Sequence, residues 1–261
     1  MKIKANGITM NYEVAGSGPW LTLSHSLACN LGMWDEQMAA LASRYKVLRY
    51  DTRGHGGTDA PEGPYTLEQM ADDAYALLQA LGIARTHWVG LSMGGMIAQV
   101  FALKYPGVFA GMVLADTTSR YPPEAAALWA ERVKTAREKG MGALVEPTLA
   151  RWFTEPFRQS QPQTMERVAN YIRTTPVAGY AGSCQAIPQI DVTHRLKEIA
   201  APTLIVVGEQ DAGTPVALAR AIHEGKPGSE LVIIPSASHL SNIEQPQAFT
   251  KAVLDFLARA D

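Results

Sequence analysis

Short apolar runs alternate with segments of helical spacing along most of the chain, and this alternation restricts the fold more than any other feature. Continuous apolar runs are typical of parallel strands buried on both faces, and the intervening helices supply the crossover connections. The sequence therefore predicts an α/β protein with a mostly parallel sheet and helices on both faces. A hairpin is expected around Asn6-Gly7 in residues 2–15, and further strands at 20–26, 45–52, 86–92, 111–117, 202–211 and 230–239. Helices are expected at 33–43, 66–82, 93–106, 214–224 and 246–259.

Residues 119–185 interrupt this alternation. The stretch contains several segments with helical spacing, separated by prolines, and no convincing strand. A regular pattern of this length is not typical of a linker. We therefore expect a helical cap at 119–185, inserted into a core domain formed by residues 1–118 and 186–261.

Composition excludes several classes of protein. With 261 residues, 47% hydrophobic and 18% charged, the chain is long and apolar enough to bury a substantial core. The net charge of -2 and the lack of a basic stripe argue against a nucleic-acid partner. The start of the chain lacks the apolar core of a signal peptide, and no apolar run is long enough to span a membrane. Two cysteines, Cys29 and Cys184, offer neither a metal-binding spacing nor a disulfide framework. A soluble cytoplasmic protein is expected, and its oligomeric state is not indicated.

One serine follows a predicted strand in the pattern G-x-S-x-G, at Gly90, Ser92 and Gly94. A serine at the apex of a sharp strand-to-helix turn is how one large class of enzymes presents a nucleophile. The hydroxyl of Ser92 is a weak nucleophile at neutral pH, so it needs a base and a group that orients the base.

His239 is the candidate base, because it follows an apolar run and the carboxyl edge of an open α/β sheet is where ligands bind. Asp211 follows another such run and is the candidate orienting acid. Asp116 is the rival candidate for the orienting acid. Its alternative role is to shape the loop or to contact the cap. The order Ser92, Asp211, His239 is the chain order of the α/β-hydrolases. Among the other histidines, His87, His194 and His223 are expected to be solvated, and His25 and His55 to be structural.

An oxyanion hole requires backbone N–H groups that point at the developing charge. One is expected from Met93, directly after the nucleophile and at the start of a helix. The second is expected from the loop after strand 20–26, at Leu27 or, alternatively, Ser26. The glycine-rich stretch 50–61 does not have the spacing of a phosphate-binding loop. Arg53 and His55 are expected to hold that stretch in place through hydrogen bonds.

Taken together, "SHS", "YDTRGHGGTD", "GLSMGG", "GEQD" and "SHLSNIEQP" resemble the α/β-hydrolase superfamily over nearly the whole chain. Within it, the stretches "SHSLACNLGMWDEQ", "ARWFTEPF", "TPVAGYAGSCQAI" and "ASHLSNIEQPQAF" are most similar to 3-oxoadipate enol-lactonases. The resemblance implies an eight-stranded sheet with a helical lid, no metal and no organic cofactor. It places Ser92, Asp211 and His239 on the positions of the family's triad.

The implied reaction is the opening of a five-membered enol lactone that carries a carboxymethyl arm, through an acyl-enzyme, to give 3-oxoadipate. The free carboxylate of this small-molecule substrate requires a cation or several donors. Alternatives are a carboxylesterase or an N-acyl-homoserine lactonase with the same triad, and, in a different class, a non-catalytic binding protein of the same fold. The residues expected to bind substrate are Ser26, Trp34, Trp129, Arg132, Arg151 and Trp152. The spacing of Trp34 is equally compatible with a position in the core.

Overall fold

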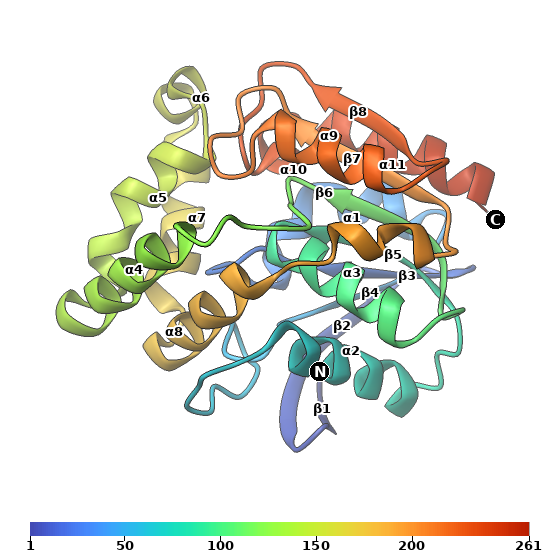
Figure 1. The fold of residues 1–261 in the computed structure, drawn as a ribbon, viewed down its shortest axis with the longest axis horizontal. Helices are drawn as coiled ribbons and strands as arrows, with labels where there is room; N and C mark the ends of the chain where they lie inside the picture. Colours follow the sequence, from blue (N-terminus) through green and yellow to red (C-terminus); the bar gives the residue numbers. More distant parts are fainter. Residues whose placement is uncertain (261) are drawn as a thin grey trace.

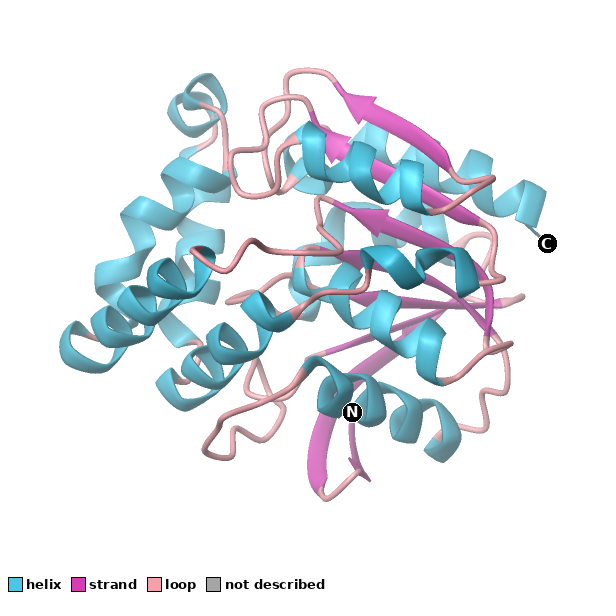
Figure 2. Ribbon diagram, in the orientation of Figure 1, coloured by secondary structure: helices cyan, strands magenta, loops and turns pink. Residues whose placement is uncertain are grey.

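A computed structural model describes residues 1–260, which form one eight-stranded sheet in the order β1-β2-β4-β3-β5-β6-β7-β8 (Figures 1 and 2). The pairs that involve β1 and β2 are antiparallel, and all the others are parallel. This is the mostly parallel sheet that the apolar runs predict. The strands are β1 (Lys2–Ala5), β2 (Ile8–Ala15), β3 (Trp20–Ser24), β4 (Lys46–Tyr50), β5 (Thr86–Leu91), β6 (Phe109–Ala115), β7 (Thr203–Gly208) and β8 (Glu230–Ile234).

Helices cover both faces of the sheet (Figure 1). Helix α2 packs on α3 on one face, with α9 beside β7 and β8, whereas α1 packs on α11 on the other. Strands β5 and β7 are buried at every residue, as the continuous apolar runs require. The core helices are α1 (Asp35–Ala42), α2 (Leu67–Ala80), α3 (Met93–Lys104), α9 (Val216–Gly225), α10 (Ser241–Glu244) and α11 (Pro246–Ala260). Among the described residues, no helix is both long and apolar enough to cross a membrane.

Five α-helices lie between β6 and β7 and form a separate layer beyond the carboxyl ends of the parallel strands (Figure 1). They occupy the stretch expected to be the cap, although the last of them ends at Ala186, one residue beyond the expected boundary. An isolated bridge between Arg120 and Asp191 joins the two connections to the core. The cap helices are α4 (Ala125–Lys139), α5 (Val145–Trp152), α6 (Glu155–Ser160), α7 (Pro162–Thr174) and α8 (Val177–Ala186).

Several strands end earlier than the apolar runs do, and these differences position the site. The run expected to form a strand at 230–239 is a strand only as far as Ile234. Ser236 adopts a positive φ of 53°, which strands do not accommodate, so residues 235–240 form a loop. Strand β6 likewise ends at Ala115, and the next residue, Asp116, has a φ of 44°. Polar side chains therefore gather on loops at the edge of the sheet that faces the cap.

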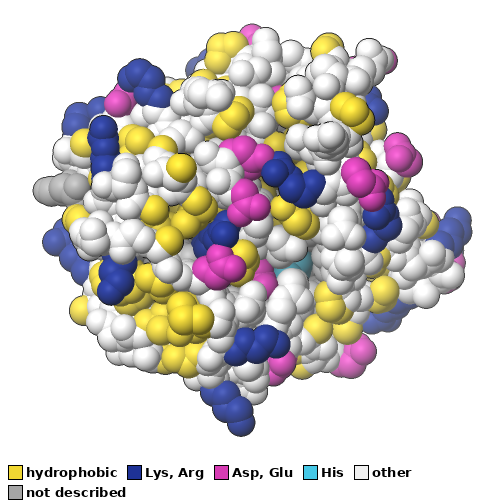
Figure 3. All heavy atoms as spheres, turned by 180° about the vertical axis from the view of Figure 1, so that it is seen from behind, with side chains coloured by type: hydrophobic (Ala, Val, Ile, Leu, Met, Phe, Trp, Pro, Cys, Tyr) yellow, Lys and Arg dark blue, Asp and Glu magenta, His cyan; other side chains and the backbone are white. Residues whose placement is uncertain are grey.

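The surface carries no dominant charge on the face shown in Figure 3, where acidic and basic side chains are interspersed. This distribution agrees with the small net charge of -2.

Candidate active site

Ser92 occupies a sharp turn between β5 and α3. Its backbone angles, φ 55° and ψ -112°, lie outside the regions that non-glycine residues usually adopt. A Cβ at Gly90 would lie 2.2 Å from the carbonyl oxygen of Gly94, and a Cβ at Gly94 would lie 2.1 Å from that of Ser24. Both glycines of the G-x-S-x-G pattern are therefore required, because the turn brings strand, helix and the neighbouring β3 into contact. The turn presents the hydroxyl of Ser92 at the edge of the sheet.

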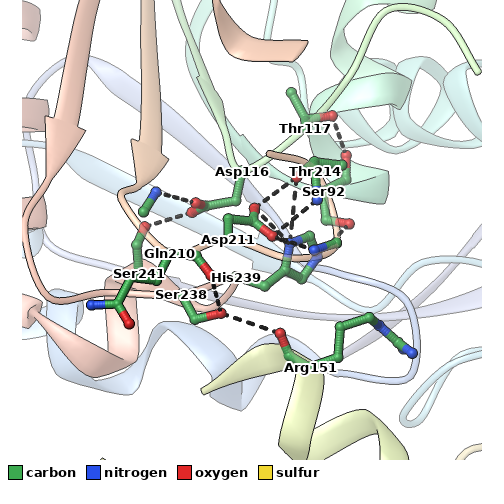
Figure 4. Close-up of polar contacts among 12 residues, drawn as sticks. Ser92, Asp116, Thr117, Arg151, Gln210, Asp211, Thr214, Ser238, His239 and Ser241 are labelled. Atoms are coloured by element: carbon green, nitrogen blue, oxygen red, sulfur yellow. Dashed lines mark hydrogen bonds and ion pairs between the residues drawn. The ribbon is translucent and has the colours of Figure 1, made fainter. Parts of the chain in front are cut away.

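Three side chains from separate loops form a continuous chain of hydrogen bonds at this edge (Figure 4). The Nε2 atom of His239 lies 3.0 Å from the Oγ atom of Ser92. The Nδ1 atom of the same ring lies 2.9 and 3.0 Å from the two carboxylate oxygens of Asp211. A proton on Nδ1 satisfies the carboxylate and leaves Nε2 to accept the serine proton. This is the arrangement in which a serine hydroxyl can be activated.

Asp211 is held in place by its own loop. Its Oδ1 accepts the N–H groups of Gly213 and Thr214 at 2.7 and 2.9 Å, and its Oδ2 accepts the Thr214 hydroxyl at 2.8 Å. Burial acts to raise the pKa of Asp211, but the interactions with His239 and Thr214 outweigh burial and leave the pKa below its ordinary value. The carboxylate is therefore ionised at neutral pH and can stabilise a protonated imidazole.

Asp116 shapes the loop and does not contact the histidine. Its Oδ1 accepts the N–H of Gly208 at 2.7 Å, and its Oδ2 accepts the hydroxyl of Ser241 at 2.5 Å. Burial, reinforced by the charge of the nearby Asp211, raises the pKa of Asp116 well above its ordinary value. The structure thus gives the two candidate acids different environments: one faces the imidazole and the other joins the ends of β7 and α10.

The loop after β3 orients a peptide group beside Ser92. The side chain of His25 accepts the N–H of Thr52 at Nε2, at 3.0 Å, so its proton resides on Nδ1. That Nδ1 lies 2.7 Å from the carbonyl oxygen of Ser26 and donates to it. In a trans peptide the N–H points away from the C=O, so the N–H of Leu27 is turned to the opposite side. Burial lowers the pKa of His25 and keeps the ring neutral in this role.

The N–H of Met93 is the other donor expected for an oxyanion hole. Met93 is the first residue of α3, and the first N–H groups of a helix have no carbonyl partner within it. The helix dipole adds positive potential there. Ser26 differs from Leu27 and Met93, because the group that it offers is a side chain and not a backbone N–H. Its hydroxyl is buried without a hydrogen-bond partner among the described residues.

A cavity of about 80 Å³ lies over Ser92 and His239, between the sheet edge and the cap. Helix α5 closes one side, with the ring of Trp152 stacked over that of His239 at a centroid distance of 6.2 Å. Helix α4 closes another side, where the guanidinium of Arg132 lies 4.4 Å from the ring centroid of Trp129. The lining residues are Ser26, Leu27, Ser92, Tyr121, Ala125, Leu128, Trp129, Arg132, Arg151, Trp152, Gly213 and His239.

Two arginines of this cavity have no acidic partner. In the part of the chain that the structure describes, the guanidinium groups of Arg132 and Arg151 make no hydrogen bond and no ion pair. Burial, together with the charge of Arg132, lowers the pKa of Arg151 to about 10. Two cations side by side without a counter-ion are unfavourable unless an anion joins them. This part of the cavity is thus suited to an anionic group.

Trp34 does not line the cavity, so its expected role in binding substrate is wrong and the alternative of a core position is confirmed. Its side chain is fully buried, and its ring packs 6.3 Å from that of Phe249 in the core. The expectation that His87 is solvated is also wrong, because it is buried on β5 with its ring edge against Tyr45. His87 lies within β5, which is buried at every residue.

The sequence reasoning missed several lining residues and one supporting residue. Tyr121, Leu128 and Gly213 line the cavity, and nothing in their spacing marks them. Thr214 had a recognisable signal, because a threonine three residues after an aspartate is typical of turns in which side chains bond to the local backbone.

The glycine-rich stretch 50–61 is held by Arg53 and His55, as expected. Arg53 pairs with the buried carboxylate of Asp73 through two hydrogen bonds of 2.6 and 2.7 Å. His55 accepts the N–H of Ala28 at 3.1 Å and thereby also supports the loop that carries Leu27. Among residues 1–260, no cluster of histidine, cysteine, aspartate and glutamate side chains is arranged to hold a metal ion.

Comparison with known proteins agrees with this geometry. A family model described as the alpha/beta hydrolase fold matches residues 19–246, and the chain belongs to that family. It is 37% identical over 253 residues to a 3-oxoadipate enol-lactonase of Acinetobacter baylyi, covering 96% of this chain and 94% of the relative. The proteins to which it is similar are therefore hydrolases, and the chain is a hydrolase of this fold.

Two solved structures have closely similar folds. The enol-lactonase of Burkholderia xenovorans superimposes with a TM-score of 0.95 at 38% identity, covering 99% of this chain and 100% of the other. An esterase of Thermogutta terrifontis, solved with malate bound, superimposes with a TM-score of 0.95 at 32% identity, covering 100% and 99%. The similarity extends over the cap as well as the core.

Proposed function

We propose that this protein is a serine hydrolase that opens a lactone ester through an acyl-enzyme, with 3-oxoadipate enol-lactone as its substrate. The observation that carries the proposal is the combination of two features in one cavity. Ser92 and His239 lie within hydrogen-bond distance, and two arginines without acidic partners lie on the cap side. The first feature suits an ester, and the second suits an ester that carries a free carboxylate.

The reaction proceeds in two halves. The Oγ atom of Ser92 attacks the ring carbonyl carbon while His239 takes its proton at Nε2, and the oxyanion accepts the N–H groups of Met93 and Leu27. The bond between the carbonyl carbon and the ring oxygen then breaks, and His239 returns the proton to the departing enol oxygen. The enol becomes a ketone. A water molecule, deprotonated by His239, attacks the acyl carbon and releases the second carboxylate from Ser92.

The arginine pair provides the preference for an anionic substrate. A guanidinium binds a carboxylate through two parallel hydrogen bonds, and such bonds are stronger in a cavity with little water. The names of the relatives support the choice of substrate, since two of them are enol-lactonases. The esterase solved with malate supports a site that accommodates a dicarboxylate, as the product 3-oxoadipate is.

The decisive experiment compares kcat/KM on 3-oxoadipate enol-lactone, an N-acyl-homoserine lactone and p-nitrophenyl acetate. We expect the anionic lactone to be preferred, and Arg151→Met to lower kcat/KM on it by about 10–100-fold, the value of a charged hydrogen bond. The same variant should leave p-nitrophenyl acetate within about threefold. Arg137→Met is the matched control, because Arg137 is exposed on the same cap.

Three outcomes would contradict the proposal. Preference for either neutral substrate would show that the arginine pair does not select the substrate. An equal loss on all substrates in Arg151→Met would show that the residue supports the cap and not the substrate. Turnover no faster than that of Ser92→Ala would indicate a binding protein that has kept the fold without the reaction.

A further inference from the structure

A second cavity, of about 250 Å³, lies in the cap and opens to solvent at its exposed lining residues Leu128, Glu131, Ala143 and Pro147; we call it the cap cavity. It is formed by α4, α5, α8 and the turn before α5, with Thr135, Thr148 and Tyr180 among its lining residues. It is about three times the size of the cavity over Ser92, which measures about 80 Å³. None of the residues that perform the proposed reaction lines it.

The two cavities share a wall. Leu128, Arg132 and Arg151 line both of them, so these three side chains separate the space over Ser92 from the cap cavity. Leu128 and Arg132 lie on α4 and Arg151 lies on α5, so changes of rotamer in these side chains would connect the two cavities. Neither arginine is fixed by an ion pair to a described residue, and the contact that a change of rotamer at Arg132 must break is its stacking on Trp129, at 4.4 Å.

The chemistry of the wall indicates the kind of ligand that would cross it. Leu128 is 56% exposed, and besides Met1 it is the one large hydrophobic side chain of residues 1–260 that is so exposed. An apolar side chain beside two arginines without acidic partners fits a ligand that has an apolar chain and an anionic end. The lactone of the proposed function is too short to use both features together with the cap cavity.

We propose that the cap cavity receives the distal end of acyl chains that are longer than the lactone and end in a carboxylate. The chain passes Leu128, and the carboxylate binds Arg132 and Arg151 from the cap side. This inference rests on the proposed role of Ser92 as the nucleophile, and it does not rest on enol-lactone as the substrate. The enzyme would then hydrolyse monoesters of dicarboxylic acids over a wide range of lengths.

The test uses p-nitrophenyl monoesters of butanedioic and octanedioic acid, each compared with its methyl-capped diester. We expect the free carboxylate to raise kcat/KM at least tenfold over the methyl cap for the eight-carbon chain. Thr135→Phe fills the cap cavity without touching the cavity over Ser92. It should lower kcat/KM at least tenfold for the eight-carbon monoester and leave the four-carbon monoester within about twofold.

Ala130→Phe is the matched control, because Ala130 lies on the same helix, is exposed and lines neither cavity. Ala130→Phe should leave kcat/KM unchanged for both monoesters. Equal losses on both chain lengths in Thr135→Phe, or no loss on either, would overturn the proposal. Equal wild-type kcat/KM values for the eight-carbon monoester and its methyl-capped form would also overturn the proposal.

A second measurement uses the unaltered enzyme. Octanoate, which has an apolar chain and a carboxylate, should inhibit p-nitrophenyl acetate hydrolysis at least tenfold more tightly than octan-1-ol, which lacks the charge, and inhibition of equal strength would contradict the proposal. Loss of enol-lactone turnover with the chain-length pattern intact would reject only the proposed substrate. A Ser92→Ala variant that still hydrolyses the esters would reject the nucleophile and, with it, both proposals.

Discussion

At the scale of single residues, the carboxylates of Asp116 and Asp211 are close enough to influence each other, yet they have different partners. Asp211 contacts the imidazole of His239, and Asp116 contacts Gly208 and Ser241. Two side chains of the same type thus have different roles because their neighbours differ. The hydrogen-bond donors to Asp211 include an imidazole ring that becomes charged, whereas the donors to Asp116 are neutral. A pair of matched amide substitutions separates these roles.

We predict that Asp211→Asn lowers kcat by about 10³–10⁴-fold, because an amide no longer favours the required tautomer or stabilises the imidazolium. Asp116→Asn should keep kcat within about threefold, because an amide oxygen still accepts the Gly208 N–H and its NH₂ group can donate to Ser241. Asparagine also tolerates the φ of 44° at position 116. Steady-state hydrolysis of p-nitrophenyl acetate measures both. Equal losses in the two variants would mean that Asp116 acts on the histidine after all.

The same Asp116→Asn variant has a predicted pH signature in stability. The pKa of Asp116 is raised in the folded protein, so the folded state binds more protons than the unfolded state between the unfolded pKa, about 3.9, and the folded pKa. Wild-type stability therefore falls as pH rises through that window, and the asparagine variant lacks this loss. The difference in Tm between variant and wild type should grow as pH increases from about 4 to neutrality. A difference that is constant over this range would contradict the raised pKa.

At the scale of elements, the cap is bonded directly to the loop that carries His239. The hydroxyl of Ser238 donates to the carbonyl of Arg151, at 3.2 Å (Figure 4), and the N–H of Leu240 donates to the carbonyl of Trp152, also at 3.2 Å. The carboxylate of Glu244 bridges the same two parts. It accepts the N–H of Ser238 at 2.8 Å and, from the cap, the N–H and hydroxyl of Thr154.

We predict that Glu244→Gln lowers kcat by about tenfold with KM little changed, because an amide cannot accept from both Ser238 and Thr154. The loss should be equal on p-nitrophenyl acetate and on a carboxylate-bearing ester, since Glu244 positions the histidine and does not contact the substrate. Thr154→Val removes one donor and should cost less than Glu244→Gln. The measurement is made at a temperature at which each variant is fully folded. A rise in KM confined to the carboxylate ester would show that Glu244 acts on the cap arginines instead.

Elements also mark the limit of sequence-based prediction. Regular strands and helices were predictable, because burial on both faces gives continuous apolar runs and the G-x-S-x-G turn has strict steric needs. The loops were less predictable, as shown by the strand that was expected to reach residue 239 and ends at Ile234. The roles of His25 in orienting the Ser26 carbonyl, and of Glu244 in joining the cap to the base loop, depend on long-range contacts. A single sequence carries no local signal for contacts of this kind.

At the scale of the whole molecule, helix α8 lies against the loop after β4 so closely that only glycine fits. A Cβ at Gly179 would lie 1.9 Å from the carbonyl oxygen of Gly54, and a Cβ at Gly182 would lie 2.8 Å from the ring of Tyr65. Helix α8 also packs on α4, which carries Trp129 and Arg132 into the cavity. The position of the cap on the core therefore determines the shape of the cavity.

We predict that Gly179→Ala separates the cap from the core and lowers both stability and activity. Overpacking against backbone typically costs about 1–3 kcal/mol, which corresponds to a fall in Tm of about 2–12 °C for a chain of this size. Because the displacement reaches α4, kcat/KM on carboxylate-bearing esters should fall more than kcat/KM on p-nitrophenyl acetate. Gly142→Ala is the matched control, since a Cβ there meets nothing within 4 Å. An alanine at 179 that behaves like an alanine at 142 would mean that the cap shifts at no cost, and that its fit on the core does not set the substrate preference.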